Sequence, residues 1–298
     1  MDAALVHARR GRLRRVSTVP SWLRVVVLSL SAALVAVSAV VLFRNGRLPA
    51  AVPDDAPEYA LADLMAALQH LDSRGYVRGQ ALAADRAALD RFIAAMAKTS
   101  PLTSPERFPT TDDRVAFWLN AAHALVLQQL ADHPDATSIE QLSRWQSWPI
   151  GGQRMTRDAI ERRFLAETGD GRVWLALFDG SAGGPLLDSA PFGGDTLNPQ
   201  LDDAARRFLR RTESIQLALP VVKLTPRITG HLDDFLSALP EGRSGVLQIV
   251  WAYLPESCDG VRPGCETRGD LDRGCGVDFS RCRVEPLPPV AGVALTTR

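Results

Sequence analysis

Five polar residues in the central part of the sequence have side chains that could take part in catalysis or ligand binding. Asn120 and His123 lie in the apolar run RVAFWLNAAHALVLQQL, and Glu161, Asp179 and Ser181 follow further along the chain. Histidine can act as a general base, a carboxylate pair can transfer protons or hold a cation, and an activated serine can attack a carbonyl group. These residues therefore allow hydrolytic chemistry only if folding brings them into one cleft.

The loop LFDGSAGGP, residues 177–185, combines small residues with one acid and one serine. Its glycines can present backbone N–H groups to an anion, but their spacing fits neither a P-loop nor a dinucleotide-binding loop. Ser181 lies outside the G-x-S-x-G nucleophile motif, because Asp179 stands where that motif needs its first glycine. We therefore expect Ser181 to be a turn residue. Asp179 and Glu161 are expected to be surface or capping acids unless they reach the same cleft.

The apolar run from Arg114 to Leu130 is expected to form a helix in the centre of the domain. It is apolar on nearly every side, which is typical of a helix that packs against neighbours all round. Asn120 and His123 are its polar exceptions and, being three residues apart, share one face. A buried polar group without a hydrogen bond costs about 1–3 kcal/mol. The pair therefore either holds neighbouring segments by hydrogen bonds, which we favour, or faces a cleft.

The remaining patterns predict helices first and strands mixed with helices later, which indicates an α+β fold. We expect helices over residues 59–71, 83–98 and 198–211, a core strand over 172–178, strand-like segments over 215–224 and 246–254, and a short helix over 231–239. The core strand is expected because RVWLALF is short, apolar and flanked by glycines. The helical N-terminal half is expected to pack on a small mixed sheet.

A long apolar segment precedes this domain. Residues 25–43, VVVLSLSAALVAVSAVVLF, contain no charged residue. As a helix that rises about 1.5 Å per residue they span roughly 28 Å, close to the hydrocarbon core of a bilayer. The segment is longer than the apolar part of a cleaved signal peptide, roughly 7–15 residues. We therefore expect an uncleaved transmembrane helix in the bacterial inner membrane, with a cleaved signal or a twin-arginine signal as alternatives.

The charges around this segment predict its orientation. Residues 1–24 contain six arginines and one acid, and the positive-inside rule keeps such a tail in the cytoplasm. Residues 25–298 contain 28 basic and 33 acidic residues, a net charge of −5, which leaves no basic face for nucleic acid. The expected layout is a cytoplasmic tail (1–24), a transmembrane helix (25–43), a linker (44–56), a periplasmic domain (57–255) and a C-terminal extension (256–298).

All four cysteines lie in the C-terminal extension, with the spacing C-x6-C-x9-C-x6-C. They are Cys258, Cys265, Cys275 and Cys282. An even, clustered set in an exported domain indicates two disulfide bonds, and all three pairings stay open. Zinc sites usually have closer pairs such as C-x2-C, so a metal site is the less favoured alternative. The acids of this segment lack the ligand pattern of a calcium loop, and we expect no metal and no cofactor.

Several sequence blocks occur in a fixed order along the chain: ADRAALDRFIAAMA, AFWLNAAHALVL, TSIEQL, DAIERRF, RVWLALFDGSAGGPLL and LDDAARRFL. Over residues 60–254 this order resembles the domain-of-unknown-function family numbered 547, which occurs in bacterial exported proteins and in plants. In that family the central helix reads Phe-Trp-Ile-Asn-x-Tyr-Asn-Ala-Leu, a later helix holds Ile-Glu-His, and a strand holds Arg-x-His-Phe-Ala. Cysteines follow in the next loop. The resemblance implies a cysteine-hydrolase-like site in the family.

This sequence departs from that pattern at the positions that would carry the chemistry. Asn120, Glu161, Gly180 and Pro185 match the family pattern. His123 replaces an asparagine, Arg162 and Trp174 replace histidines, and Asp179 and Gly184 replace cysteines. A cysteine nucleophile needs a thiolate and a base to form it, and neither is present at these positions. The resemblance therefore implies a catalytically degenerate member that keeps the shape of the loop.

The patterns together predict a membrane-anchored periplasmic binding or assembly module rather than an enzyme. Its ligand site is expected to combine Asn120, His123, Glu161, Asp179 and Gly180, and to hold a peptide, a glycan or a partner protein of the cell envelope. One alternative is a hydrolase with a rebuilt site that uses His123, Glu161, Asp179 or Ser181. The other is a structural envelope protein without a ligand. Convergence of the polar residues in one pocket would favour a site, and Trp174 filling the space between them would argue against it.

Overall fold

The computed structural model describes residues 21–143, 145–211, 215–218, 221–229, 283–286 and 292–296. The chain divides into two compact units, Met1–Val41 and Leu42–Arg298. The predicted helix over 231–239 and the predicted strand over 246–254 lie outside the described residues. The same is true of the four cysteines, so their predicted disulfide bonds stay a prediction.

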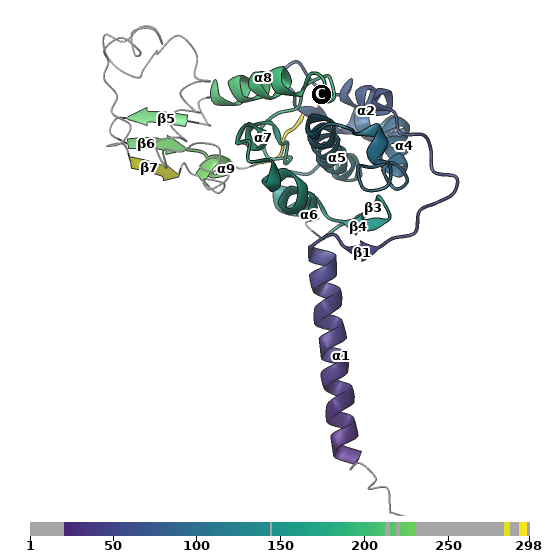
Figure 1. The fold of residues 1–298 in the computed structure, drawn as a ribbon. Helices are drawn as coiled ribbons and strands as arrows, with labels where there is room; N and C mark the ends of the chain where they lie inside the picture. The colour runs from purple at the N-terminus through teal and green to yellow at the C-terminus, as the bar shows by residue number, and fades with distance from the viewer. Residues whose placement is uncertain are drawn as a thin grey trace, which may run out of the picture. The chain divides into compact units, whose positions relative to one another are not determined.

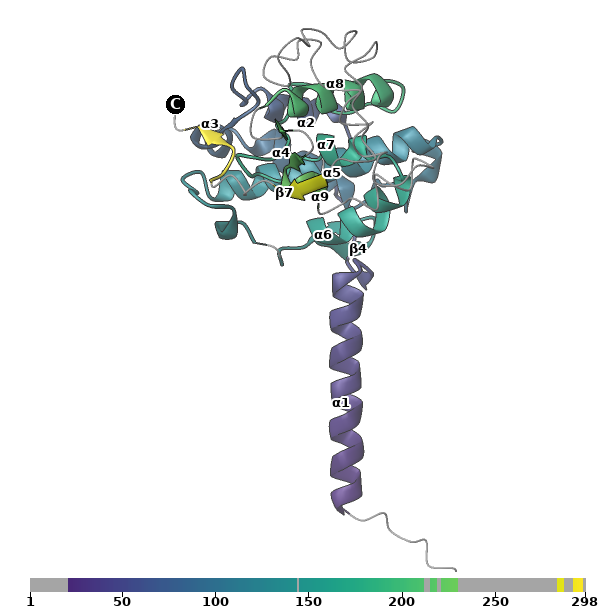
Figure 2. The same ribbon diagram turned by 90° about the vertical axis from the view of Figure 1, so that its left-hand side faces the viewer.

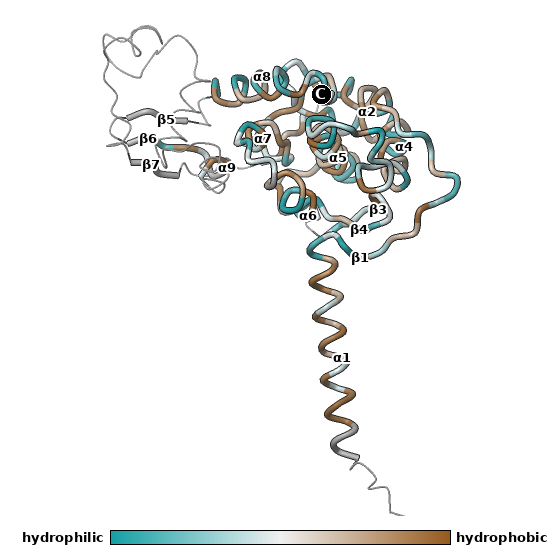
Figure 3. The backbone as a smooth tube through the Cα atoms, in the orientation of Figure 1, coloured by the Kyte–Doolittle hydropathy of each residue, from teal (hydrophilic) through white to brown (hydrophobic). Residues whose placement is uncertain are grey.

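The first described element is the helix α1 (Ser21–Arg44), and most of its residues that are coloured in Figure 3 are hydrophobic. Its segment Val25–Arg44 is long and apolar enough to cross a bilayer, and none of it is buried inside the protein. A single helix of this kind near the N-terminus suits either a membrane anchor or a signal sequence. The predicted apolar helix is therefore confirmed, while its position in a membrane stays a prediction.

Four helices form the first part of the second unit: α2 (Leu61–Leu68), α3 (Gly79–Ala84), α4 (Ala87–Met96) and α5 (Thr111–Asp132). The predicted helix over 83–98 is instead the end of α3 followed by α4, because Asp85 leaves the helical region with φ −126° and ψ 55°. Arg86 then binds Asp90 at 2.9 Å and Asp132 at 2.7 Å. These ion pairs hold the start of α4 against the end of α5.

Helix α5 lies in the centre of this unit (Figure 1), where it packs against α3, α4, α6 (Arg157–Ile160) and α8 (Leu197–Leu209). A capping box starts the helix. Thr110 Oγ1 accepts a hydrogen bond from the Asp113 N–H at 3.0 Å, and the Asp113 carboxylate accepts one from the Thr110 N–H at 3.0 Å. The helix is buried without a break over residues 115–127. The predicted central helix is therefore confirmed, and its polar residues need partners inside the protein.

A small antiparallel sheet combines two strands that follow α5 with one strand from the start of this unit. The sheet has the order β1-β4-β3, with β1 (Leu48–Pro49), β3 (Trp148–Ile150) and β4 (Gln153–Met155). Gly151 and Gly152 form the β3–β4 turn with φ of 55° and 71°, a left-handed conformation that glycine adopts at little cost. The chain then enters α6, which continues as the π-helical turn η3 (Glu161–Leu165) and the 3-10 turn η4 (Ala166–Thr168).

Residues 172–178 differ from the predicted core strand, because they begin as the helix α7 (Arg172–Ala176). The Asp170 side chain accepts a hydrogen bond from the Arg172 N–H at 2.9 Å, and this bond starts the helical turn. Leu177 then leaves the helix with an extended backbone. Every residue from 173 to 178 is buried, and such a short apolar run has no periodicity that separates a helix from a strand. The expectation of a strand is therefore wrong here.

Small sheets complete the described part of this unit. After α8, strands β5 (Ile215–Ala218) and β6 (Val221–Leu224) pair antiparallel, and β6 pairs parallel with β7 (Arg283–Pro286). Helix α9 (Pro226–Thr229) contacts β6 and β7. Strand β2 (Val77–Arg78) pairs parallel with β8 (Leu295–Thr296), which lies next to α3 (Figure 2). The predicted mixture of helices and small sheets is confirmed, although the described strands form three sheets rather than one.

Candidate functional site

Asn120 lies on α5 and is buried. Its Nδ2 donates a hydrogen bond to the Phe192 carbonyl oxygen at 2.8 Å, and its Oδ1 accepts one from the Phe192 N–H at 2.9 Å. Both polar atoms of the amide are used by a single residue that comes 72 positions later in the chain. The side chain therefore fastens the segment before α8 to the central helix.

His123 lies on the same face of α5, one turn further along, and is also buried. Its Nε2 accepts a hydrogen bond from the Phe178 N–H at 3.1 Å. Because Nε2 is the acceptor, the proton of the neutral ring is assigned to Nδ1. A general base must direct its lone pair at a substrate proton, whereas the Nε2 lone pair here is directed at the backbone. The ring thus holds the extended end of α7 against α5.

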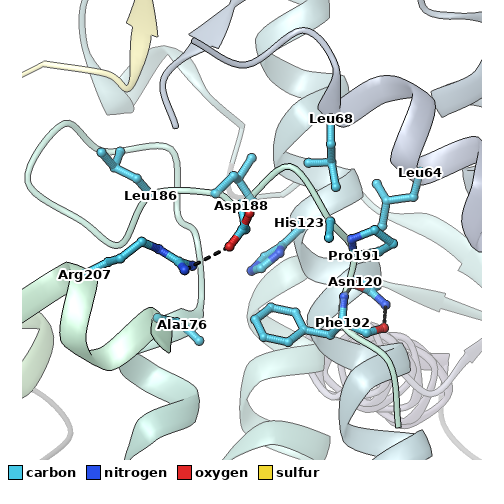
Figure 4. Close-up of a pocket in the computed structure, with 13 residues that line it drawn as sticks. Leu64, Leu68, Asn120, His123, Ala176, Leu186, Asp188, Pro191, Phe192 and Arg207 are labelled. Atoms are coloured by element: carbon cyan, nitrogen blue, oxygen red, sulfur yellow. Dashed lines mark hydrogen bonds and ion pairs between the residues drawn. The ribbon is translucent and has the colours of Figure 1, made fainter. Parts of the chain in front are cut away.

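Asn120 and His123 line a small crevice between α2, α5, α8 and residues 186–192 (Figure 4). Its cavity of about 10 Å³ has roughly the size that one water molecule needs. Asp188 and Arg207, which are about half exposed, form an ion pair at 2.9 Å on its outer side. The crevice is therefore too small for an organic substrate in this conformation.

Glu161 and Asp179 do not line this crevice. They belong to a second group that is built around Arg157, whose Nε lies 3.5 Å from Glu161 Oε1. The Arg157 Nη1 donates a hydrogen bond to the backbone oxygen of Asp179 at 3.1 Å. The structure thus divides the four polar residues into two groups. Trp174 is buried in α7 and lines neither the crevice nor any other described pocket.

Ser181 and Asp179 form a tight turn at the start of the loop 179–185. The Ser181 hydroxyl donates to Asp179 Oδ1 at 2.6 Å, and the Ser181 N–H donates to the same oxygen at 2.8 Å. Gly184 lies against this turn, where a Cβ would come within 2.5 Å of Asp179 Oδ1. Gly180 has φ +85°, and a Cβ there would lie 3.1 Å from the side chain of Val126. The small residues of LFDGSAGGP are explained by this compact turn.

Two other segments hold the same loop in place. Arg211, just beyond α8, donates to the carbonyl oxygens of Gly184, at 2.6 Å, and Ala182. The C-terminal residues 292–296 bind the loop through backbone hydrogen bonds. The loop is therefore fixed by long-range contacts as well as by its own turn.

A groove that lies beside the crevice was not predicted from the sequence. It has a volume of about 680 Å³ and is lined by residues of the segments 68–76, 186–189 and 204–211. Its charged residues are Asp72, Arg74, Asp188, Arg207, Arg210 and Arg211. The available signal was RRFLRR, residues 206–211, in which three of the arginines recur at helical spacing. Only a helix over residues 198–211 was predicted from the sequence in this region.

The groove contains more positively charged than negatively charged side chains. Burial raises the pKa of Asp72, but hydrogen bonds from the N–H groups of Tyr76 and Arg74 and from the Arg74 guanidinium outweigh it and hold the pKa below its usual value. Asp72 thus forms an ion pair with Arg74 at 3.1 Å, and Asp188 forms one with Arg207. The guanidinium group of Arg210 makes no ion pair with the described residues. Four guanidinium groups against two carboxylates give a formal charge of +2.

A comparison with protein families covers the part of the chain that contains both groups of polar residues. Residues 106–209 match the model of the family described as "Protein of unknown function, DUF547". These residues belong to the DUF547 family. The prediction of this family, made over residues 60–254, is confirmed for this central part. No curated protein and no solved structure matches the chain.

The boundaries of the DUF547 segment divide the groove. Residues 186–189 and helix α8 with Arg207 lie inside the matched range, whereas the wall of residues 68–76 and Arg210 lie outside it. The polar residues predicted for the site all lie inside it. The DUF547 segment therefore supplies the loop 179–185, one wall of the groove and most of the crevice, to which α2 adds Leu64 and Leu68.

Proposed function

We propose that this protein is a membrane-tethered module that binds an anionic ligand in the groove lined by the segments 68–76, 186–189 and 204–211. The groove itself is the observation that carries the proposal, because it is open, has a volume of about 680 Å³ and contains four guanidinium groups against two carboxylates. Ligand pockets usually have volumes of roughly 300–1,000 Å³. Guanidinium groups bind carboxylates and phosphates through paired, planar hydrogen bonds.

The hydrogen bonds of the DUF547 segment favour binding over catalysis. Asn120 and His123 bond to backbone atoms of their own chain, and the Ser181 hydroxyl donates to Asp179. A hydrolase with a rebuilt site would need a nucleophile and a base that face a common space. The crevice next to His123 is about 10 Å³, which leaves no such space for a substrate.

The helix α1 supplies the tether of the proposed module. Its apolar length suits an uncleaved inner-membrane anchor. The six arginines of residues 1–24 favour a cytoplasmic N-terminus, and the groove then faces the periplasm. The ligand in this proposal is an acidic component of the cell envelope, either a peptide or a glycan.

A binding titration on the full-length protein in detergent tests the proposal. The probes are a fluorescent hexaglutamate peptide and an oligouronate, each beside a neutral counterpart, and the readout is fluorescence anisotropy. We expect an acidic probe to bind and its affinity to fall as salt screens the exposed charges. Arg207→Gln and Arg210→Gln should each weaken binding about tenfold, which corresponds to about 1.4 kcal/mol.

Arg206→Gln is the matched control, because Arg206 lies on the same helix, pairs with Asp203 and does not line the groove. Its affinity should equal that of the unmodified protein. Equal binding of acidic and neutral probes, or unchanged affinity in both groove variants, would overturn the proposal. Turnover of ester or amide probes that Ser181→Ala abolishes would instead support the hydrolase alternative.

A further inference from the structure

The C-terminal residues 292–296 lie in the protein as an extended peptide beside the loop 179–185. The Ala294 N–H donates a hydrogen bond to the Gly180 carbonyl oxygen at 2.8 Å, and the Ala182 N–H donates one to the Gly292 carbonyl oxygen at 3.1 Å. These bonds form an antiparallel bridge between the two segments. Only backbone atoms take part, so the contact does not depend on polar side chains.

The same residues pair with a second segment on the other side. The Val77 N–H donates to the Ala294 carbonyl oxygen at 2.9 Å, and β8 continues in parallel register along β2, with Leu295 beside Val77. The extended segment is therefore inserted between β2 and the loop 179–185. Both backbone groups of Ala294 are bonded, one on each side.

The side chains of the inserted segment fit this slot closely. Ala294 is fully buried and Val293 is 9% exposed. Gly79 lies under Leu295, where a Cβ would come within 2.9 Å of Leu295 Cδ2. The slot therefore fits the small side chain of Ala294 closely, and the lack of a side chain at Gly79 leaves room for Leu295.

We propose that the slot between β2 and the loop 179–185 is a binding site for an extended peptide, which residues 292–296 fill in cis. Addition of a strand to exposed backbone groups is a common mode of peptide recognition, in which backbone bonds give affinity and alternate side chains give specificity. The occupant lies outside the DUF547 segment, whereas the loop that it binds lies inside it. A peptide with the same small-then-leucine pattern takes the place of residues 292–296 when these are absent.

This site differs from the arginine groove, whose lining contains neither the loop residues 180–182 nor residues 292–296. The two sites also recognise different chemistry, since the slot binds backbone groups and small apolar side chains. The occupant of the slot bonds directly to Gly180 and Ala182, which flank Ser181. Occupancy of the slot therefore fixes the conformation of the loop that carries Asp179 and Ser181.

The test uses the full chain in detergent and a variant that ends at residue 291. A fluorescent peptide AGVALTTR, residues 291–298, is titrated against both proteins, and thermal unfolding is followed in parallel. We expect the peptide to bind the shortened chain and to raise its melting temperature. The intact chain, whose slot is filled, should bind at least tenfold more weakly. A peptide with Ala294→Pro has the same charge but lacks the N–H that bonds Gly180, and it should lose at least tenfold in affinity.

If the shortened chain fails to fold, the peptide is added during refolding. Recovery of the native unfolding transition by the unmodified peptide, but not by the proline peptide, would then support the site. The proposal would be overturned by a shortened chain that keeps the native unfolding transition but binds no peptide. It would also be overturned if a shortened chain that fails to fold did not regain that transition with the peptide. Hexaglutamate binding in the refolded or shortened samples reports the arginine groove separately, so a failure of one site is not mistaken for a failure of the other.

Discussion

The two hydrogen bonds of Asn120 allow a quantitative test of its role. Asn120→Ala leaves the N–H and the carbonyl oxygen of Phe192 without this partner in a region where Asn120 is 1% and Phe192 8% exposed. An unsatisfied buried group costs about 1–3 kcal/mol, so two of them lower the free energy of unfolding by about 4 kcal/mol. In a domain of this size 1 kcal/mol shifts the melting temperature by roughly 2–4 °C. We therefore expect a fall of roughly 8–16 °C.

Chemical denaturation and thermal unfolding of the full-length protein in detergent measure this loss, with the hexaglutamate titration run on the same samples. Gln80→Ala is the matched control, because this exposed amide makes a single described hydrogen bond, to Asp135 at 2.8 Å. Its stability should change by no more than about 0.5 kcal/mol. If Asn120→Ala kept its melting temperature within about 2 °C and lost hexaglutamate binding, Asn120 would be a ligand contact and the structural reasoning would be refuted.

Three further predictions concern the loop, the central helix and the response to pH. Gly180→Ala should lower the free energy of unfolding by about 1–2 kcal/mol in urea denaturation, because φ is +85° and a Cβ would crowd Val126; Gly183→Ala is the comparison within the same loop. Thr110→Ala should cost about 1 kcal/mol in the same assay through loss of the α5 capping box, and an unchanged value would contradict the assigned cap. Burial raises the pKa of Tyr59 well above its usual 10.0, with Arg107 opposing the shift in part, so the folded state keeps this proton when the unfolded chain loses it. The resulting contribution to stability is complete below about pH 10 and is lost as pH rises above it, and Tyr59→Phe should flatten that decline in an alkaline unfolding series.

Helices α5 and α7 show what local sequence can predict in this chain. Helix α5 is long and apolar all round, and three polar residues at its start offer caps, so its length and burial follow from the sequence. Helix α7 has only Arg172–Ala176, all but the first of them buried. The hydrogen bond that starts this helix, from the Arg172 N–H to the Asp170 side chain, lies before the apolar run. A rule that weighs apolarity and flanking glycines therefore selects a strand.

The separation of Glu161 from His123 depends on tertiary contacts that the sequence pattern does not contain. Glu161 lies four residues after Arg157 and forms an ion pair with it at 3.5 Å. Arg157 in turn donates a hydrogen bond to the backbone oxygen of Asp179, whereas His123 accepts one from Phe178. Sequence reasoning had no means to assign these residues to two groups.

The arginine groove presents a different difficulty. Arg207, Arg210 and Arg211 share a face because they are three and four residues apart, and this face is visible in the sequence. The opposite wall, residues 68–76, comes about 130 positions earlier in the chain, and only the packing of α2 near α8 brings it there. One wall of a groove is therefore indistinguishable, in sequence, from the solvated side of a helix.

The loop 179–185 connects these observations. Asp179 stands where the family resemblance implies a cysteine, and its carboxylate accepts both bonds that fold the turn at Ser181. A thiol is a weak acceptor and would hold that turn less firmly. Compared with the cysteine that the resemblance implies, Asp179 thus supplies a group that stabilises the loop, while Arg157 and the backbone of residues 292–296 hold the loop from other directions. The same loop supplies the backbone groups of Gly180 and Ala182 to the proposed slot, so the contacts that constrain the loop also shape that slot.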